Sequence, residues 1–420
     1  MFRGDSPWEL FTTLTTSDMA LYLRDRSARG FNSVLVEAID NIWNANGTGA
    51  NANGDMPFTT KQGGGSYTNS TTQSPDFSTP NEPYWKQVDA GMALCQAYGF
   101  HVLFYPIWIG NPISDPSGEG YYNALNAQSA GIRQAYGAFV GARYKPYKNL
   151  IWVVGGDNNP ATTAVVSDVV AGIQSVDTSH LFSCDLLDGD SPLTNTMGWT
   201  PAETCVRDGV NNIYCDQLRS HPWTFAQCKT EYQRVDFPTV PYFQKEGAYE
   251  GDGDTGSVAQ HWRSQTWQSL LGGGCGWHFG NSTIWKFGAG WQGQLGIRGT
   301  LDTQQANTFT ARRRWDLLVP DWGNTFLTNG GSYTNANFAS AARASDGTWA
   351  AIYVPTNESL TVDLSGFTTS SIIVQWFDPT TSALSTATGS PFSNSGTHTF
   401  SATPGTNAQG DADWVLLFNG

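Results

Sequence analysis

Two acidic residues follow apolar runs of the kind that form buried β-strands. Asp157 comes after the run Ile151–Val154 and a pair of glycines, which let backbone and ligand approach closely. Glu246 ends the apolar segment 240–246. Two such carboxyl groups at one site can break a glycosidic bond, because one protonates the leaving oxygen and the other attacks the anomeric carbon or activates water. Asp157 could instead cap a helix that opens at Pro160, but we favour a catalytic role for both carboxylates.

Other carboxylates also stand at the ends of predicted strands. Several of them must be structural, because buried carboxylates commonly pair with arginine or cap a helix. They are Asp5, Glu37, Asp40, Asp185 and Asp216. His278 and Trp285, beside the last predicted strand, could bind sugar hydroxyls and a sugar face, although a core histidine or tryptophan is the commoner case. We predict that the residues that bind substrate are Asp5, Trp8, Glu37, Trp108, His278 and Trp285.

No other set of catalytic residues in the sequence fits as well. There is no G-x-S-x-G, no H-E-x-x-H and no phosphate-binding glycine loop. The six cysteines have no C-x-x-C spacing, so we expect neither a metal site nor a cofactor. A disulfide is favoured in the loop-rich segment 205–228, and the pairing stays open among Cys184, Cys205, Cys215 and Cys228. Cys95 and Cys275 lie in apolar segments typical of buried thiols.

The charge and composition of the chain exclude some partners and favour others. A net charge of −14 and a pI near 4.7 argue against nucleic acid and anionic membranes. Only 14% of the residues are charged, and 17 Trp, 16 Tyr and 22 Phe suit an extracellular protein that stacks rings on sugars, although most of these rings fill the core. No apolar run is long enough to span a membrane. No signal peptide opens the sequence. From the composition we still expect a secreted or periplasmic monomer that acts on a carbohydrate, with its leader absent from this sequence.

Eight short apolar runs alternate with helical patterns along residues 1–320, which indicates an α/β fold of the (β/α)8 barrel (TIM barrel) type. The predicted strands span residues 2–4, 31–38, 100–108, 150–154, 181–186, 212–215, 240–246 and 274–279. Thr16 or Ser17 is predicted to cap the first helix, and the other predicted helices begin at Pro83, near Ile132, at Asn158 or Asn159, at Ser257 and at Thr303. The carboxyl ends of barrel strands meet on one face, where barrel enzymes bind substrate.

Two connections after strands are unusually long, and both would lie on that face. Residues 40–79 are rich in Asn, Gly, Ser and Thr, and either shape a binding site or form flexible surface. Residues 280–300 contain Trp285 and Trp291. From residue 321 to 420 the apolar period changes to two, so we predict a small all-β sandwich. Its strand-like runs are 348–354, 360–364, 372–377, 398–401 and 414–418.

Three segments, Gly4–Phe11, Tyr22–Phe31 and Asn149–Pro160, resemble the apiosidase-like barrel of glycoside hydrolase family 140. Glu246–Glu250 resembles the GEPxYE segment of that family. Two departures stand there: Ala248 replaces the proline of the segment, and Lys245 stands where an aspartate is common. The tail, through the segments 376–379 and 413–417, resembles the sandwich usually attached to this barrel, which is named for collagen binding.

The resemblance implies an exo-acting enzyme that releases terminal D-apiose, a branched furanose of plant pectin side chains and glycosides. It implies Asp157 as general acid, or acid/base, and Glu246 as nucleophile or base. Retention or inversion of configuration depends on the carboxylate separation, about 5 Å against about 6.5–9.5 Å. Two alternatives are another furanosidase on the same barrel, such as an arabinofuranoside-specific enzyme, and a non-catalytic carbohydrate-binding protein.

Overall fold

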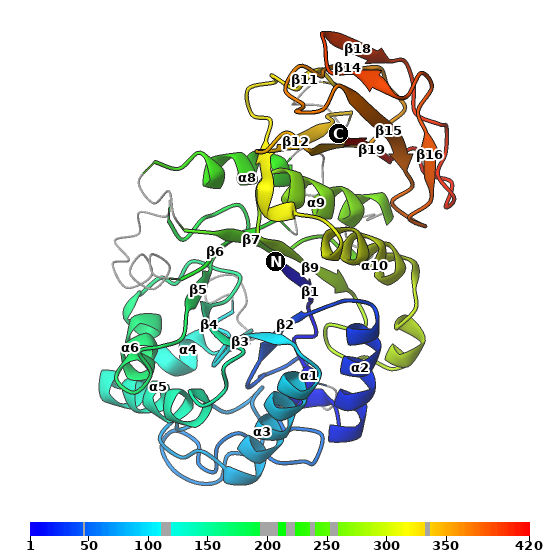
Figure 1. Ribbon diagram of the computed structural model, residues 1–420. Helices are drawn as coiled ribbons and strands as arrows, with labels where there is room; N and C mark the ends of the chain where they lie inside the picture. Colours follow the sequence, from blue (N-terminus) through cyan, green and yellow to red (C-terminus); the bar gives the residue numbers. More distant parts are fainter. Residues whose placement is uncertain are drawn as a thin grey trace.

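A computed structural model describes residues 1–44, 47–110, 119–193, 209–215, 223–235, 240–252, 259–331 and 337–420. Eight parallel strands form a nearly closed barrel in the larger part of the chain (Figure 1). In chain order they are β1 Phe2–Asp5, β2 Ser33–Glu37, β3 His101–Tyr105, β4 Leu150–Gly155, β5 Phe182–Asp185, β6 Asn211–Tyr214, β7 Tyr242–Glu246 and β9 Gly276–Asn281. Each overlaps one of the eight predicted strands, so the predicted barrel is confirmed.

The strands lie in the order β5-β4-β3-β2-β1-β9-β7-β6, and side chains complete the ring between its two ends. The Asn212 amide on β6 donates to the Ser183 hydroxyl at 2.9 Å and to the Cys184 carbonyl oxygen at 2.5 Å, both on β5. The backbone N–H of Val210 adds a bond of 3.0 Å to the Phe182 carbonyl. The two edge strands therefore stay close enough to bring their carboxyl ends to the same face as the others.

Alternate residues of each strand face opposite sides of the barrel wall, and both sides are apolar. Leu35, Leu103, Val153 and Phe243 face inward in one cluster that also contains Tyr105. Their neighbours in sequence face outward and pack under the surrounding helices, namely Val34, Val36, Val102, Phe104, Trp152 and Val154. Burial on both faces explains why these strands are continuous apolar runs in the sequence.

Nine described α-helices accompany the barrel strands (Figure 1). They are α1 Leu10–Thr13, α2 Thr16–Ala28, α3 Glu82–Ala97, α4 Tyr122–Asn126, α5 Ala130–Tyr144, α6 Ala164–Gln174, α8 Trp223–Tyr232, α9 Ala259–Leu271 and α10 Arg298–Ala311. Three predicted helix starts were wrong. Thr15, not Thr16 or Ser17, caps α2 by accepting from the Asp18 N–H. The helix expected at Asn158 or Asn159 begins only at Ala164, and the one expected at Thr303 begins at Arg298.

The C-terminal part is an antiparallel β-sandwich, as predicted. One sheet has the order β10-β12-β13-β19-β15-β16 with β17 beside β15, and the other has the order β11-β14-β18. The strands are β10 Leu318–Pro320, β11 Leu327–Asn329, β12 Ser340–Ala344, β13 Trp349–Val354, β14 Leu360–Asp363, β15 Ser371–Phe377, β16 Leu384–Thr386, β17 Phe392–Ser393, β18 Thr397–Phe400 and β19 Trp414–Asn419. The strand β10, which lies just before the predicted domain boundary at residue 320, already pairs with β12 of the sandwich. The boundary itself stays a prediction.

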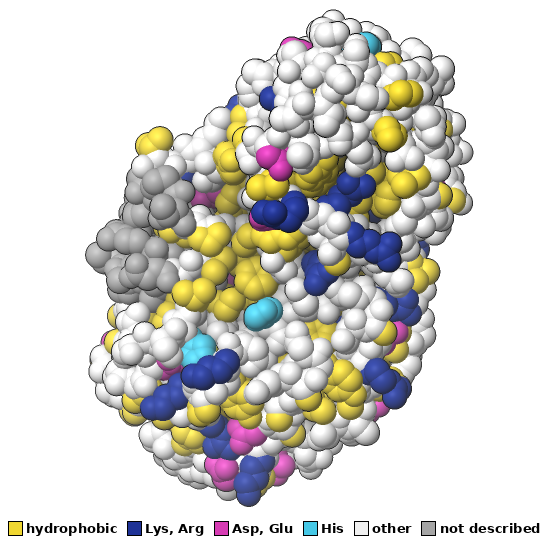
Figure 2. Space-filling view, in the orientation of Figure 1, with side chains coloured by type: hydrophobic (Ala, Val, Ile, Leu, Met, Phe, Trp, Pro, Cys, Tyr) yellow, Lys and Arg dark blue, Asp and Glu magenta, His cyan; other side chains and the backbone are white. Residues whose placement is uncertain are grey.

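The sandwich packs against α9 and α10 of the barrel (Figure 1). Trp267 and Phe309 from these helices form one buried cluster with Tyr353 and Phe377 of the sandwich. Figure 2 shows that Lys and Arg side chains gather on the surface near this junction, while uncoloured polar and backbone atoms cover much of the rest. The junction therefore combines an apolar centre with a charged margin.

A buried arginine, Arg263 on α9, crosses the same junction with three carboxylates around it. It forms a two-pronged pair with Asp413, through Nε at 2.9 Å and Nη2 at 2.6 Å. Its other bonds reach Asp302 at 2.8 Å and Asp411 at 2.5 Å. Tyr353 donates to Asp413 at 3.0 Å. Side chains of both domains therefore form hydrogen bonds with the guanidinium and with its main partner, Asp413.

The long connection 40–79 is folded rather than flexible in its described residues. Phe58, Tyr67 and Phe77 from this segment are buried in the main core beside Trp85 of α3. Its backbone pairs at Phe58 with Pro80 and at two further bridges. Of the two alternatives for this segment, flexible surface is therefore wrong for its described residues, because its aromatic residues provide apolar burial that the overall composition does not indicate.

The cysteine predictions have mixed outcomes. Cys95 and Cys275 are thiols, the first fully buried and the second partly buried, as expected. Cys228 is also a thiol, so a disulfide through this residue is wrong. It lies on α8 against Gly272, which directly follows α9, and burial raises its pKa to about 12. Cys205 and the carboxylate Asp216 lie outside the described residues.

Candidate active site

A cavity of about 420 Å³ opens at the carboxyl ends of the barrel strands. Its lining residues are Trp8, Glu37, Trp43, Trp108, Glu119, Asp157, Tyr214, Glu246, Tyr249, Asp252, Ser282, Trp285 and Lys286. Six of the eight predicted site residues are in this set, and the catalytic pair is among them. Asp5 and His278 are the two that do not line the cavity. The face predicted from strand polarity is the face on which the cavity lies.

Asp157 reaches the cavity from a turn that the sequence makes possible directly after β4. Gly155 has φ of 102° and Gly156 has φ of 146°, and Asp157 itself has φ of 50°, a left-handed conformation that is uncommon for a non-glycine residue. A side chain on Gly156 would overlap the Trp108 ring. The strained turn ends β4 abruptly and leaves the Asp157 carboxylate 29% exposed toward the cavity.

Lys245 stands at the centre of the acidic side chains. Its ammonium lies 2.6 Å from Asp185, 3.1 Å from Asp157 and 3.1 Å from Glu246, and the side chain is fully buried. It also stands 3.6 Å from the centre of the Tyr214 ring. Burial alone would lower the pKa of Lys245, but the neighbouring carboxylates raise it above its ordinary value. The lysine is therefore a permanent cation at the base of the cavity.

Glu246 ends β7 and is held from a second side by aromatic residues. The Tyr249 hydroxyl donates to Glu246 Oε1, and the Trp8 indole N–H donates to the Tyr249 oxygen at 2.8 Å. The Cys215 thiol donates to the Glu246 carbonyl at 3.4 Å. The Glu246 side chain is 6% exposed, so only a small part of its surface lines the cavity.

Asp185, at the end of β5, supports Lys245 without lining the cavity. Its Oδ1 binds the ammonium, and its Oδ2 accepts from the Tyr105 hydroxyl at 3.0 Å. Burial raises the pKa of Asp185 to about 6, and the charge on Lys245 acts in the opposite direction. Asp185 therefore fixes the lysine from behind while Asp157 and Glu246 face the cavity.

The geometry around Lys245 limits the separation of the two candidate catalytic carboxyls. Oδ1 of Asp157 and Oε2 of Glu246 each lie 3.1 Å from Nζ, so these two oxygens are at most twice that distance, 6.2 Å, apart. Paired carboxyls are about 5–5.5 Å apart in retaining glycosidases and about 6.5–9.5 Å apart in inverting ones. The limit of 6.2 Å lies between the two classes, and it places both carboxyls close enough to act on one glycosidic bond.

Asp5 is part of a buried ion pair instead of the cavity wall. The inward-facing residues of β1 are Phe2 and Gly4, so the next residue, Asp5, faces outward toward α2. There it accepts from Arg26 and, at 2.6 Å, from the Tyr22 hydroxyl. The predicted role in substrate binding has no geometric support, because side-chain alternation points this carboxylate away from the cavity.

His278 faces inward on β9, but it is packed within the barrel rather than exposed to the cavity. Its ring fills the space left by the missing side chain of Gly4 and lies 5.5 Å from the Phe243 ring. Burial lowers the pKa of His278 to about 3, so the imidazole is neutral. It is a core histidine, which was the alternative considered from the sequence.

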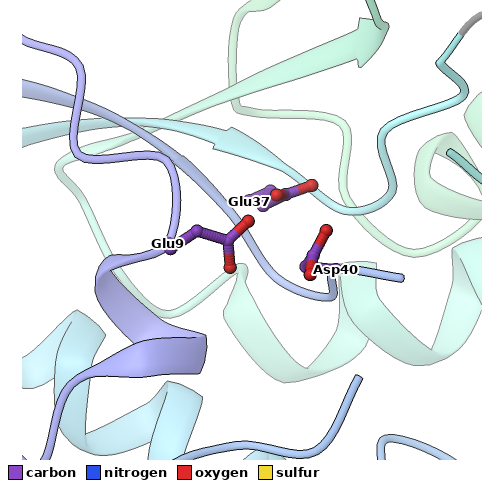
Figure 3. Close-up of side chains that lie close together, drawn as sticks. All are labelled: Glu9, Glu37 and Asp40. Carbon is purple, nitrogen blue, oxygen red and sulfur yellow. The ribbon is translucent and has the colours of Figure 1, made fainter. Parts of the chain in front are cut away.

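Three buried carboxyl groups, Glu9, Glu37 and Asp40, face one another next to the cavity (Figure 3). Each offers an oxygen within 4.8 Å of the others, and Glu37 also lines the cavity. Burial raises the pKa of Glu9 to about 8, that of Asp40 to about 6 and that of Glu37 well above its ordinary value. This is the one group among the described residues that has the spacing of metal ligands. Buried carboxyl groups this close to one another can also share a proton.

Aromatic side chains from the two long connections form the rim of the cavity. Trp43 and Trp285 meet edge to face with ring centres 5.5 Å apart. The Lys286 ammonium lies 5.5 Å from the first ring centre and 5.0 Å from the second. Trp43 is 36% exposed, so one side of its indole is open for contact with a ligand. Trp291, in the same connection as Trp285, is instead buried against Tyr22.

Several cavity residues were not predicted from the sequence, namely Trp43, Glu119, Tyr214, Tyr249, Asp252, Ser282 and Lys286. Most of them lie in connections, where no periodicity marks the direction of a side chain. Tyr249 had a usable signal, because it lies within the Glu246–Glu250 segment that carried the resemblance.

No helix among the described residues has the length and apolar character needed to cross a membrane.

Comparison with known proteins gives two family matches and a set of similar folds. Residues 1–334 match the family described as "Apiosidase-like, catalytic domain", and residues 319–419 match the one described as "Putative collagen-binding domain of a collagenase". No curated protein matches the sequence.

Solved structures similar to this chain share its fold at low sequence identity. One, named "Glycoside hydrolase", is 19% identical with a TM-score of 0.74, over 99% of this chain and 92% of the other. Another, a glycoside hydrolase family 5 protein from Bacteroides vulgatus, is 18% identical with a TM-score of 0.75, over 99% of this chain and 88% of the other. The likeness covers both the barrel and the sandwich.

Proposed function

This chain belongs to the family of apiosidase-like catalytic domains, and on that premise we propose that it releases terminal D-apiose from plant glycans or glycosides. The coarser activity, hydrolysis of a glycosidic bond, follows from the family. One observation carries the assignment to residues: Asp157 and Glu246, from different strands, line the same cavity and contact the same buried ammonium. The proposed roles are Asp157 as acid/base and Glu246 as nucleophile.

In the first step, Asp157 gives its proton to the leaving oxygen while Glu246 attacks the anomeric carbon. The bond from that carbon to the leaving oxygen breaks, and its electron pair stays with the oxygen that takes the proton. Tyr249 supports this step, because its hydroxyl donates to Oε1 of Glu246 and thereby orients the carboxylate. Oδ1 of Asp157 and Oε2 of Glu246 lie at most 6.2 Å apart, twice 3.1 Å, which is compatible with direct attack by Glu246.

In the second step, water hydrolyses the bond between the sugar and Glu246. Asp157, now a carboxylate, removes a proton from this water, and Glu246 leaves as a carboxylate. Two displacements at one carbon return the original configuration, so we propose that the enzyme retains configuration. The 29% exposure of Asp157 supports its part here, since water must reach it.

The cavity is small enough for a terminal sugar, and its rim suits a larger leaving group. Its volume of about 420 Å³ lies at the lower end of ligand sites, which supports exo-action. The open face of Trp43 beside Trp285 offers stacking for the sugar or aglycone on the leaving side. Pectin side chains as substrate and secretion as location remain part of the proposal, supported by the low charge and the aromatic content.

The proposed activity is tested with a panel of aryl glycosides and apiosylated glucosides. We expect release of apiose with retained configuration. NMR of the first-formed sugar measures this configuration. Turnover of arabinofuranosides without apiosides would reject the sugar assignment, and no turnover of any glycoside by folded protein would reject the activity. Loss of activity in Asp157→Asn should be greater for poor leaving groups than for nitrophenol, because only poor leaving groups need the proton.

A further inference from the structure

Lys245 is a buried cation that the two proposed catalytic residues do not by themselves explain. Its side chain has no exposed surface, and it is held from behind by Asp185 at 2.6 Å. Asp185 is held in turn by the Tyr105 hydroxyl, and the Tyr214 ring covers the ammonium at 3.6 Å. These contacts fix Nζ on the side away from the cavity.

On the cavity side, the same nitrogen lies close to both reacting carboxyl groups, donating a hydrogen bond to Asp157 and forming an ion pair with Glu246. Oδ1 of Asp157 and Oε2 of Glu246 are both 3.1 Å away. An ammonium has three N–H donors, and three carboxylates surround this one. An arginine binds three carboxylates around the edge of its planar fork, as Arg263 does, whereas the three carboxylates at Lys245 surround a single nitrogen atom.

The two steps of the proposed reaction move one negative charge between these carboxyls. Before cleavage Glu246 is a carboxylate and Asp157 carries a proton. After Glu246 has bonded to the anomeric carbon, it has lost its charge, while Asp157 has given its proton to the leaving oxygen and become a carboxylate. The charge on the pair is therefore constant, but its position changes.

We propose that Lys245 is the fixed counter-ion of the reaction, neutralising Glu246 before bond cleavage and Asp157 after it, without moving. Asp185 is then a positioning residue that keeps the ammonium midway. The inference rests on the proposed function, and it adds a group that stabilises both chemical steps. A cation already in place needs no reorganisation when the charge moves, which is the condition under which electrostatic stabilisation is largest.

Lys245→Met tests this role, with the double variant Lys245→Met/Asp185→Asn as the form that leaves no unpaired buried charge at Asp185. We expect both the formation and the breakdown of the glycosyl-enzyme to slow by about 100-fold per folded molecule, measured by rapid-quench kinetics. Arg263→Met is the matched control, because it removes another buried cation with three carboxylates but lies outside the cavity. The control should keep both rates within a small factor.

The pH–rate profile gives a readout that a purely structural lysine would not affect. The titratable and charged groups around Lys245 are Asp157, Asp185, Glu246, Tyr105 and Tyr214. Tyr249, on Glu246, and Glu37, near Asp157, are the next groups along each side. Both limbs of the pH–rate profile should move to higher pH in Lys245→Met, because the reacting carboxyls lose a positive neighbour while Asp185 stays in place. Unchanged limbs, with rates per folded molecule close to wild type, would overturn the proposal.

The wild-type enzyme gives a second test that does not depend on the variants folding. A crystal structure of the glycosyl-enzyme trapped with a fluorinated sugar should show Nζ still bound to both Asp157 and Asp185. Displacement of the lysine from Asp157 in that complex would overturn the counter-ion role. Failure of the proposed function is distinguishable, because it would appear as inactivity of the wild type on the whole glycoside panel.

Discussion

Two buried cations in this protein each have three carboxylates around them, yet their surroundings differ. Arg263, between barrel and sandwich, uses its planar fork on Asp413 and has its remaining donors on Asp302 and Asp411. Lys245, at the barrel mouth, has two of its three carboxylates facing a cavity. The same ratio of charges therefore occurs at a structural joint whose carboxylates come from both domains and at a candidate active site where two of the carboxylates face a cavity.

The comparison also shows why these two cations are different residues. A guanidinium forms two parallel bonds to one carboxylate, which fixes the orientation of one domain on the other. An ammonium is a compact point charge with no preferred plane, so it can serve carboxylates from three separate strands. Residue type, burial and the presence of a cavity together distinguish the joint between the domains from the candidate active site.

The largest effect should come from neutralising the carboxylates that face the cavity. Asp157→Asn and Glu246→Gln should each lower kcat on an apiosylated glucoside by about 10³-fold, because proton donation and nucleophilic attack are lost. The matched control is Asp411→Asn, since Asp411 also binds a buried cation and is 27% exposed against 29% for Asp157. Equal losses of kcat in Asp157→Asn and Asp411→Asn would break the distinction between the two clusters.

The reverse effect should appear at the joint. Arg263→Met leaves Asp413 and Asp302 buried without their cation, so we expect the free energy of unfolding to fall by about 3–5 kcal/mol, with kcat of the folded enzyme nearly unchanged. Chemical denaturation followed by tryptophan fluorescence measures the first quantity. Retained stability in this variant would contradict the view that the sandwich braces the barrel.

A smaller effect concerns the carboxyl trio of Glu9, Glu37 and Asp40, which has no cation of its own among the described residues. Burial raises the pKa of Glu9 from 4.5 to about 8, so the native state keeps a proton that the unfolded state releases above pH 4.5. Stability should therefore fall as pH rises from about 4.5 to about 8 and change little through Glu9 above that range.

Glu9→Gln tests this expectation, since the amide cannot ionise. Its melting temperature should exceed that of wild type by a few degrees at pH 8 and differ little at pH 4.5. The exposed Glu82→Gln serves as a control, because the pKa of Glu82 is lowered by its hydrogen bond with Arg143. Stabilisation of wild type, but not of Glu37→Gln, by added calcium would show that the trio holds a cation instead of a shared proton.

The smallest effect should come from the rim. Trp43→Ala should raise KM for an apiosylated glucoside by about 2- to 10-fold with little change in kcat, because stacking contributes about 0.5–1.5 kcal/mol. Tyr232→Ala removes an aromatic ring that is similarly exposed, 42% against 36%, but does not line the cavity. A change in kcat without a change in KM would place Trp43 in the chemistry rather than in binding.

Much of the barrel could be predicted because burial on both faces gives apolar runs that need no partner to be recognised. The position of Asp157 and Glu246 at the cavity could be predicted for the same reason, since each follows or ends such a run. The sandwich strands β10, β11, β16 and β17 were missed because two or three residues show no period. The strand β12, Ser340–Ala344, was missed because its residues are small or charged and show no apolar alternation. Helix starts failed where the cap lay one residue earlier, at Thr15, or where an irregular turn delayed α6.

The rest of the site depends on contacts between distant segments. Asp5 could have been excluded by counting alternation from Phe2, whereas the centre formed by Lys245 needs side chains from three strands that only the closed barrel brings together. Glu9 lies just before α1 and not at the end of a strand, so no pattern placed it beside Glu37. These are tertiary facts, which a single sequence does not contain.

Chemical rescue with azide tests the proposed pair most directly. With an activated aryl apioside, Asp157→Gly should regain turnover and yield an apiosyl azide of retained configuration, because azide replaces water in the second step. Glu246→Gly should yield the azide of inverted configuration, because azide replaces the nucleophile. Wild-type rates without azide in either variant, or the same product configuration from both, would contradict the assignment.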